Sequence, residues 1–238
     1  LSAAAMLVAE DIEPILQFTC RDRNRIALQS ELMGAAALGI RNLLVLRGDN
    51  PEAGDQPEAK PVFDLDPRQL LDVARRLRDT GELPTGKKVG GKAEFFLGAA
   101  DNPIDPPPGW EPKALQGKVA AGAQFAQTQF CMDVGVVERY VSRLKETGVS
   151  LALIVGIAPL RSAKSARWMK EKLFGTIIPD ATVERMEKAS DPIAEGVAIA
   201  AELIGQLSKI KGVAGVHIMA PNNDAVVPGL VQQARKAI

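Results

Sequence analysis

Six short apolar, β-prone runs recur along the chain, and nearly every one is followed by a stretch with the spacing of a helix. The clearest run covers residues 42–46, where four successive apolar residues are typical of a strand buried on both faces of a parallel sheet. The predicted strands are residues 15–19, 42–46, 94–99, 125–129, 151–157 and 213–219, and the predicted helices are 2–10, 25–38, 67–80, 112–122, 134–147, 162–174, 182–189, 192–209 and 225–237.

This alternation predicts an α/β fold with a parallel sheet. An open doubly wound sheet is an alternative, but no Gly-x-Gly-x-x-Gly turn follows any predicted strand, so the signature of a Rossmann dinucleotide site is missing. A (β/α)8 TIM barrel typically needs about 250 residues, and six βα units preceded by a helix fit its third to eighth units. We therefore expect a single barrel domain over residues 1–238, N-terminally incomplete, with the first one or two strands absent from this sequence.

Charge and composition exclude several classes of protein. The 238 residues include 29 basic and 29 acidic side chains, and this balance argues against a nucleic-acid or membrane-surface protein. No segment reaches the roughly 18 uninterrupted apolar residues of a membrane span. Cys20 and Cys131 lie far apart without metal-ligand spacing, so we expect neither a metal site nor a disulfide framework. A reducing cytoplasm fits this cysteine usage best.

Arg47-Gly48-Asp49 directly follows the predicted strand 42–46. Ligands of α/β barrels bind at the carboxyl ends of the strands. There a glycine lets the backbone approach a ligand, an Arg can meet a phosphate or carboxylate, and an Asp can face a developing positive charge. For the isolated tripeptide, a solvated turn would be the better interpretation by about three to one, given the false-positive risk of short motifs. A cell-adhesion signal is a poorer one, because the tripeptide follows a buried strand.

Polar residues recur at the other predicted strand ends, more often than one motif would explain. Asp22, Asp101 and Asn222 are good helix-cap types, and capping accounts for each with a probability near one half. Gln129 lies deep in an apolar strand, where an unpaired amide is costly, so it should hydrogen-bond a partner such as a heteroaromatic ring edge. His217 is the only histidine, and a satisfied core histidine is favoured over a catalytic one by about two to one.

Glu111 and Lys118 are seven residues apart, and we interpret them as lying two turns apart on one helix. Two charged residues with this spacing commonly lie on the solvent-exposed face of a helix. The functional interpretation is two groups that reach one extended ligand.

Taken together, these residues and their order resemble the methylenetetrahydrofolate reductase family. The resemblance covers almost the whole chain, and no single motif carries it alone. It rests on 18–24 (FTCRDRN), 37–41 (ALGIR), 46–51 (LRGDNP), 96–100 (FLGAA), 118–123 (KVAAGA), 128–130 (TQF) with Asp133, 156–159 (GIAP) and 216–217 (VH).

The resemblance implies a barrel that binds FAD and reduces methylenetetrahydrofolate to methyltetrahydrofolate. It implies that Arg47, Gly48 and Asp49 contact the flavin, and that Asp49 stabilises a cationic iminium form of the substrate. Gln129 would meet the pterin. The aromatic that stacks on folate falls at Met169, with Trp168 adjacent. The remaining cofactor positions implied by the resemblance are Gln17, Thr19, Phe63, Asp64, Ala99, Ala100, Asp101, Glu111 and Lys118.

The chain also departs from the family pattern. The family's general acid is a glutamate on the first strand, and no residue here can be assigned to it. Gln17 replaces a histidine, Asp101 replaces a tyrosine that follows the paired alanines, and Asn223 replaces an arginine on the last strand. The electron donor is either NAD(P)H or a redox protein, and homo-oligomerisation is possible.

Two functional hypotheses follow. The first is a flavoenzyme that transfers a hydride to methylenetetrahydrofolate. The second is a non-catalytic flavin- or folate-binding subunit that docks on a methyltransferase or redox partner, and fold resemblance alone does not separate the two. A corrinoid or pterin methyltransferase is a weaker third, because Arg47-Gly48-Asp49 fits it less well.

Overall fold

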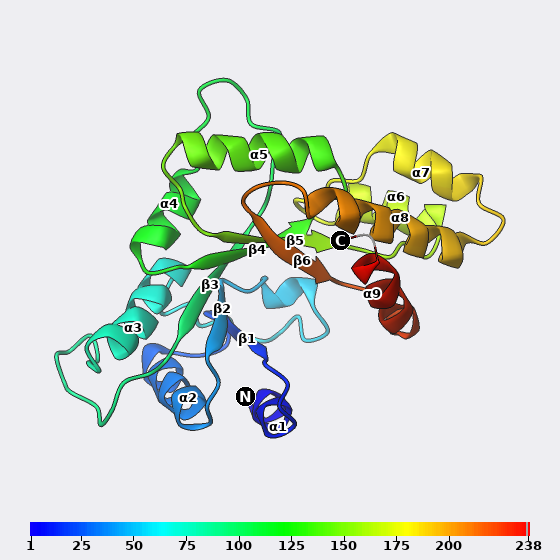
Figure 1. The fold of residues 1–238 in the computed structure, drawn as a ribbon. Coiled ribbons are helices and arrows are strands. Elements are labelled where there is room, and N and C mark those ends of the chain that lie inside the picture. The colour runs from blue at the N-terminus through cyan, green and yellow to red at the C-terminus, as the bar shows by residue number, and fades with distance from the viewer. Residues whose placement is uncertain (237) are drawn as a thin grey trace. The chain divides into compact units, whose positions relative to one another are not determined.

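The structure is a computed structural model that describes residues 1–236 and 238, and it contains two compact units (Figure 1). Unit 1 comprises Leu1–Ala100 and Lys113–Phe125, and unit 2 comprises Asp101–Pro112 and Ala126–Ile238. The single-domain prediction for residues 1–238 stays a prediction.

Unit 1 is built on parallel strands that run in chain order. Phe18 pairs with Val45 on the first two strands, and Leu43 pairs with Leu97 on the next two. The elements of this unit are α1 (Ser2–Ala9), β1 (Ile15–Thr19), α2 (Arg25–Ala37), β2 (Asn42–Leu46), the 3-10 helix η1 (Pro51–Ala53), α3 (Pro67–Asp79), β3 (Phe96–Asp101) up to Ala100, and α4 (Lys113–Ala120).

The two faces of β1–β3 have different roles. Residues in register on parallel strands point to the same face, and Phe18, Val45, Leu97 and Ala99 all belong to one buried cluster. This cluster also holds buried side chains of α2 and α3, so these helices cover that face (Figure 1). The opposite face therefore carries the alternate residues, including Gln17.

Local rules explain where α3 begins and ends. The Asp66 side chain accepts hydrogen bonds from the N–H groups of Arg68 and Gln69, and the Gln69 side chain accepts one from the Asp66 N–H, which completes a capping box. Gly81, with φ of +68°, follows the last turn. Asp66 thus fixes the end of the long loop after β2, and Gly81 follows the end of the helix.

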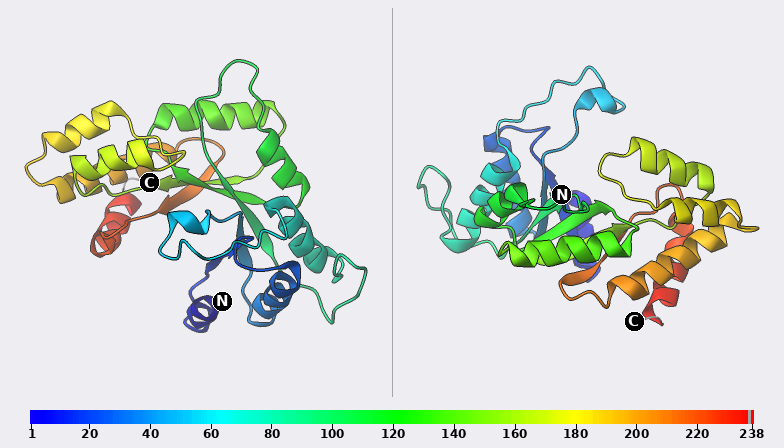
Figure 2. Two further views of the ribbon diagram at one scale, coloured as in Figure 1. Left: turned by 180° about the vertical axis from the view of Figure 1, so that it is seen from behind. Right: turned by 90° about the horizontal axis from the view of Figure 1, so that it is seen from above.

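Unit 2 continues the alternation of strands and helices (Figure 2). Its strand order also follows the chain, and the last two strands pair in parallel. Helix α8 contacts α5, α7 and α9. The elements are β4 (Phe125–Phe130) from Ala126 onward, α5 (Val134–Glu146), β5 (Ala152–Ile157), α6 (Ala163–Lys172), α7 (Asp180–Glu187), α8 (Pro192–Leu207), β6 (Val213–Ile218), the 3-10 helix η2 (Asp224–Val226) and α9 (Val227–Arg235).

The predicted α/β class is confirmed, and the succession of six βα units is the one predicted for an α/β barrel. Most boundaries differ from prediction by a residue or two at fraying ends. Strand β3 begins at Phe96 instead of Glu94 and includes Asp101, so this residue ends the strand instead of following it. The predicted end of the last helix, residue 237, lies outside the described residues.

Gly98 on β3 provides a test of packing in unit 1. A Cβ atom at this position would lie 2.1 Å from Cζ of Phe125, whose ring also stacks on Phe96 at a centroid distance of 5.2 Å. Gly98→Ala should therefore lower the free energy of unfolding by roughly 1–3 kcal/mol through overpacking, as measured by urea denaturation followed by circular dichroism. Gly215→Ala, on β6 with open space around the added atom, is the matched control and should change stability by no more than about 0.5 kcal/mol. Equal effects of both substitutions would contradict the packing argument.

Candidate functional site

In unit 1, Arg47-Gly48-Asp49 emerges directly from the carboxyl end of β2, as predicted. Gly48 has φ of +82°, and a Cβ atom on it would lie 2.9 Å from Cβ of Arg21. A side chain at this position would thus be strained by the backbone and would collide with the segment that follows β1. Glycine allows the ends of β1 and β2 to lie close together and leaves the main chain open to a ligand.

The segment after β1 is held by its own polar side chains. Asp22 accepts hydrogen bonds from Oγ1 of Thr19 at 2.9 Å and from Nε of Arg21 at 2.6 Å. The bond from Arg21 is the main cause that lowers the pKa of Asp22. Nη1 of Arg21 also approaches the main-chain oxygen of Asp49 at 3.4 Å. Asp22 is therefore not a helix cap, a role that Asn24 fills for α2.

The long loop after β2 returns to this region through Phe63 and Asp64. The guanidinium carbon of Arg47 lies 4.2 Å from the centroid of the Phe63 ring, which is a cation–π contact. Asp64 instead accepts a bidentate pair of hydrogen bonds from Arg25 and a further one from its N–H. These bonds lower the pKa of Asp64 to about 2. Phe63 thus contacts Arg47, whereas the Asp64 carboxylate binds Arg25, the first residue of α2.

Among the described residues, the Asp49 carboxylate has no hydrogen bond or ion pair, and it is exposed. Arg47 is likewise exposed and has no carboxylate partner within that part of the chain. The end of β2 therefore carries a cation and an anion on either side of an open glycine, and neither has a salt-bridge partner among the described residues.

Other predicted cofactor residues of unit 1 lie at or near the ends of β1 and β3. Gln17 and Thr19 share the face of β1 opposite the helix-facing core, whereas Ala99 points into that core and is fully buried. Nζ of Lys118 on α4 donates a hydrogen bond to the main-chain oxygen of Ala100 at 2.6 Å. Lys118 and Ala100 are thus brought together, while Ala99 can offer a ligand only its backbone.

In unit 2, the predicted cofactor residue Asp101 accepts a hydrogen bond from the hydroxyl of Tyr140 at 2.5 Å. Burial, followed by the Asp101 charge, raises the pKa of Tyr140, so this hydroxyl remains a donor. Glu111 is exposed and lies before α4, which begins at Lys113. The prediction that Glu111 and Lys118 lie two turns apart on one helix is therefore wrong, because the proline-rich loop extends to Pro112.

Gln129 does not lie as deep as its apolar neighbours indicated. Its side chain is half-buried near the end of β4, its Oε1 accepts from the N–H of Phe130 at 3.0 Å, and its Nε2 lies 3.4 Å from the main-chain oxygen of Phe174. The expectation of a hydrogen-bond partner is met by backbone groups, and the second of these bonds is long.

His217 and the two cysteines do not form a nucleophilic site. Burial lowers the pKa of His217, and Nδ1 has no hydrogen-bond partner among the described residues, so the expected satisfied core histidine is wrong in that respect. Burial raises the pKa of Cys20 and of Cys131 to about 11. Both thiols are therefore protonated near neutral pH and are poor nucleophiles.

A pocket of about 440 Å³ opens where β5 and β6 end in unit 2. The predicted stacking residues Trp168 and Met169 both line it, and the indole is 55% exposed whereas Met169 is buried. Two lining cations, Arg161 and Lys164, were not predicted. The signal for them was in the sequence: both follow the strand-ending run 156–159 within five residues, at the start of the next helix.

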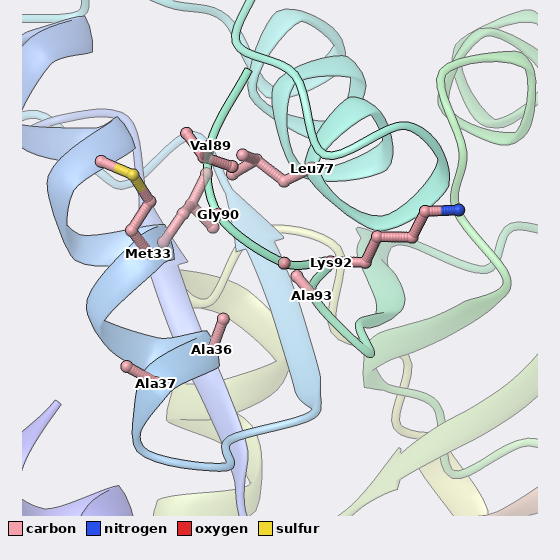
Figure 3. A pocket seen from close by; sticks show the side chains of 10 residues that line it. Met33, Ala36, Ala37, Leu77, Val89, Gly90, Lys92 and Ala93 are labelled. Atoms are coloured by element: carbon pink, nitrogen blue, oxygen red, sulfur yellow. The ribbon is translucent and has the colours of Figure 1, made fainter.

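A second pocket, in unit 1, lies away from every predicted site residue. Figure 3 shows Met33 and Ala36 of α2 near Val89 and Gly90, with the amine of Lys92 directed away. The pocket has a volume of about 330 Å³, and its lining includes no carboxylate, histidine or cysteine. It offers no group for acid–base or nucleophilic chemistry.

The described residues contain neither a metal-binding cluster nor a helix that could span a membrane. These residues include no cluster of three or more His, Cys, Asp or Glu side chains that could hold a metal ion. Within the same part of the chain, every helix is too short or too polar to cross a bilayer.

The chain is similar to two proteins that are both named methylenetetrahydrofolate reductase. A Caenorhabditis elegans protein named probable methylenetetrahydrofolate reductase (NADPH) is 30% identical over 189 residues, which are 78% of this chain and 26% of that protein. The Escherichia coli 5,10-methylenetetrahydrofolate reductase is 29% identical over 220 residues, 89% of this chain and 66% of that protein. The chain thus spans only about a quarter of the length of the first relative.

A solved structure from Clostridium thermocellum, of an uncharacterized protein that binds two copies of 5-methyl-5,6,7,8-tetrahydrofolic acid, covers 97% of both chains at 13% identity with a TM-score of 0.47. The family model described as methylenetetrahydrofolate reductase matches residues 2–235. This match includes nearly all of both units and every candidate site residue described above. The chain therefore belongs to the methylenetetrahydrofolate reductase family.

Proposed function

We propose that this chain binds FAD and reduces 5,10-methylenetetrahydrofolate to 5-methyltetrahydrofolate. The observation that carries the proposal is the end of β2, where Arg47 and Asp49 flank Gly48 and neither has a salt-bridge partner among the described residues. A free cation beside an open main chain fits a phosphate-bearing cofactor, and a free carboxylate fits a substrate that becomes cationic. Family membership supports both halves of this assignment.

The cofactor side of the proposal falls on residues of unit 1. Gly48 would admit the cofactor to the main chain, because a Cβ atom there would fill the space beside Arg21. Arg47 and Lys118 would bind its phosphates by charge-assisted hydrogen bonds. Further contacts are proposed for Gln17, Thr19, Phe63, Asp64, Ala99 and Ala100, and in unit 2 for Asp101 and Glu111. When bound and reduced by the electron donor, the flavin would supply the hydride, while the protein orients the ring and sets the charge near it.

The substrate side falls on unit 2 and on Asp49. Gln129 would hydrogen-bond the pterin, and Trp168 or Met169 would pack against the aminobenzoyl ring from the wall of the 440 Å³ pocket. The Asp49 carboxylate would favour the iminium form of the substrate, since fixed charge acts strongly once a ligand excludes water. NAD(P)H or a redox protein would reduce the flavin. A reducing compartment such as the cytoplasm fits Cys20 and Cys131, which are both free.

The direct experiment is to record the absorption spectrum of the purified protein and then to bleach the flavin band anaerobically with candidate donors. Addition of methylenetetrahydrofolate to the reduced protein should restore the band and yield methyltetrahydrofolate. A bound flavin that the folate cannot reoxidise would instead favour the non-catalytic binding subunit. Failure of the protein to bind FAD at all would refute the flavoenzyme.

Replacement of Lys118 tests the cofactor assignment. Lys118→Ala should weaken FAD binding by roughly 1.5–3 kcal/mol, the scale of a lost hydrogen bond to a charged group. Calorimetric titration of the apoprotein measures this loss. Lys113→Ala, at the exposed start of the same helix, removes an equal charge and should leave the affinity nearly unchanged. Undiminished affinity in Lys118→Ala would exclude that lysine from the site.

Replacement of Asp49 tests the electrostatic role. Asp49→Asn keeps the shape and removes the charge, so anionic reduced flavin should become more stable and the flavin potential should rise. The folate half-reaction should slow by roughly 10²–10³-fold, the usual scale for the loss of one preorganised electrostatic group. Potentiometry and single-turnover kinetics measure the two effects.

Glu58→Gln is the control for that experiment, because it removes another exposed charge from the loop after β2. It should change neither quantity appreciably. If Asp49→Asn behaves like this control, Asp49 is only a turn residue.

Replacement of Gln129 separates the two half-reactions. Gln129→Ala should leave flavin reduction by the donor nearly intact and slow reoxidation by methylenetetrahydrofolate, because the amide is proposed to meet the pterin. Stopped-flow absorbance resolves the two steps. Gln127→Ala, two residues earlier on β4, is the matched control. An equal loss in both half-reactions would assign Gln129 to the fold or to the flavin.

A further inference from the structure

In unit 2, the proline-rich loop between β3 and α4, residues 102–112, is fastened to one face of α5 (Figure 1). Nε of Arg143 donates a hydrogen bond to the main-chain oxygen of Trp110 at 2.7 Å. Arg139 donates two hydrogen bonds to the Asp105 carboxylate, at 2.7 and 2.9 Å. Residues four apart on a helix lie on the same face. A single face of α5 therefore holds the loop at two points.

Trp110 is fixed by its ring as well as by its main-chain oxygen. The ring centroid lies 5.6 Å from that of Tyr140, a residue of α5 that is buried. Aromatic pairs at this distance attract each other beyond the effect of burial alone. The Trp110 N–H donates to the main-chain oxygen of Pro107 at 3.0 Å, across a turn in which Gly109 has φ of +76°. The N–H, the oxygen and the ring of Trp110 thus each have a partner.

The prolines of this loop restrict its conformation before any ligand binds. Residues 106–108 are three successive prolines, and each proline ring fixes its own φ near −65°. Glu111 is followed by Pro112, and a residue before proline is confined mainly to extended conformations. The backbone on both sides of Glu111 is therefore constrained, by the fixed Trp110 before it and by Pro112 after it.

The Glu111 side chain, in contrast, is available to a ligand. It is exposed, and its carboxylate has no hydrogen bond or ion pair among the described residues. An ionised carboxylate accepts hydrogen bonds from hydroxyl groups, such as those of a ribose. The loop thus presents an unpartnered acceptor on a backbone that α5 holds in place.

We propose that Arg143 is a positioning residue for FAD, which holds Trp110 and thereby places the Glu111 carboxylate where the ribose hydroxyls of the cofactor bind. The inference rests on the proposed function, in which Glu111 is a cofactor contact, and it adds α5 to that site. Arg143 acts through the loop, because its Nε is bound to Trp110 and its Nη1 to Glu146 at 3.1 Å. Its effect is preorganisation, since a loop that is already ordered loses less conformational entropy on binding.

The first measurement is calorimetric titration of the apoprotein with FAD. Arg143→Met keeps an unbranched apolar side chain and removes the hydrogen-bond donor. It should weaken FAD binding roughly 5–30-fold, as expected when one further residue must be ordered on binding. Arg143→Lys keeps a donor and the positive charge, so it should recover most of the lost affinity.

A double-mutant cycle separates positioning from a general effect on the fold. Glu111→Ala removes the group that Arg143 is proposed to place. In the Glu111→Ala background, Arg143→Met should therefore weaken FAD binding by no more than about twofold further, because residues that act through one contact are not additive. The same fold-change from Arg143→Met in both backgrounds would mean that Arg143 only supports the fold, and it would overturn the proposal.

Lys145→Met is the control on the same helix. The Lys145 side chain is exposed and has no hydrogen bond or ion pair within the part of the chain that the structure describes. Its replacement removes an equal charge and should leave FAD affinity unchanged within about twofold. A loss as large as that of Arg143→Met would assign the effect to charge on α5 and would overturn the positioning role.

Hydrogen exchange in the protein without FAD tests the contact itself. The Trp110 N–H, which is bound to Pro107, should exchange faster in Arg143→Met than in the unaltered chain or in Lys145→Met, as followed by NMR. An unchanged rate in Arg143→Met would show that Arg143 does not order the loop, and the proposal would fail.

These outcomes are separable from those of the proposed function. If the chain binds FAD and reduces methylenetetrahydrofolate but the cycle is additive, the function stands and the inference fails. If the cycle shows the coupling while the folate does not reoxidise the flavin, the inference stands and the proposed catalysis fails.

Discussion

The close approach of the ends of β1 and β2 is the constraint on which the candidate site of unit 1 depends. Gly48 makes it possible, because its positive φ and its distance to Arg21 leave no space for a side chain. Since β1 and β2 pair in parallel, both strand ends lie at the same edge. Arg47 and Asp49 consequently lie on either side of the glycine, and Phe63, later in the loop, contacts Arg47.

The site is also defined by which charges the protein neutralises itself. Asp22, Asp64 and Asp101 each have a partner, in Arg21, Arg25 and Tyr140 respectively. Such groups hold loops and helices in place and are less available to a ligand. Asp49 in unit 1 and Arg161 with Lys164 in unit 2 have no such ion pair among the described residues. We therefore propose that the charges without such a partner, and not the whole set of polar strand ends, mark the positions where ligands bind.

The two compact units differ in the roles proposed for them. Most of the predicted cofactor residues belong to unit 1, whereas Gln129, Trp168 and Met169, with their proposed role in substrate binding, belong to unit 2. The chain passes between the units within β3, after Pro112 and within β4. Asp101 and Glu111 are the cofactor candidates in unit 2. The structure differs from the prediction at both, because Asp101 ends β3 and accepts a hydrogen bond from Tyr140, and Glu111 lies before α4.

The sequence by itself determined the alternation of strands and helices, the capped start of α3 and the place of Arg47-Gly48-Asp49 after β2. Those features depend on periodicity and on side chains only a few residues apart, which local sequence records. Only the tertiary structure decided that Phe63 covers Arg47, that Tyr140 binds Asp101 and that Nδ1 of His217 lacks a partner among the described residues. It also decided that Arg161 stands beside Asn222, sixty-one positions away. Contacts between residues so distant in the chain depend on how whole elements pack, and no local pattern specifies them.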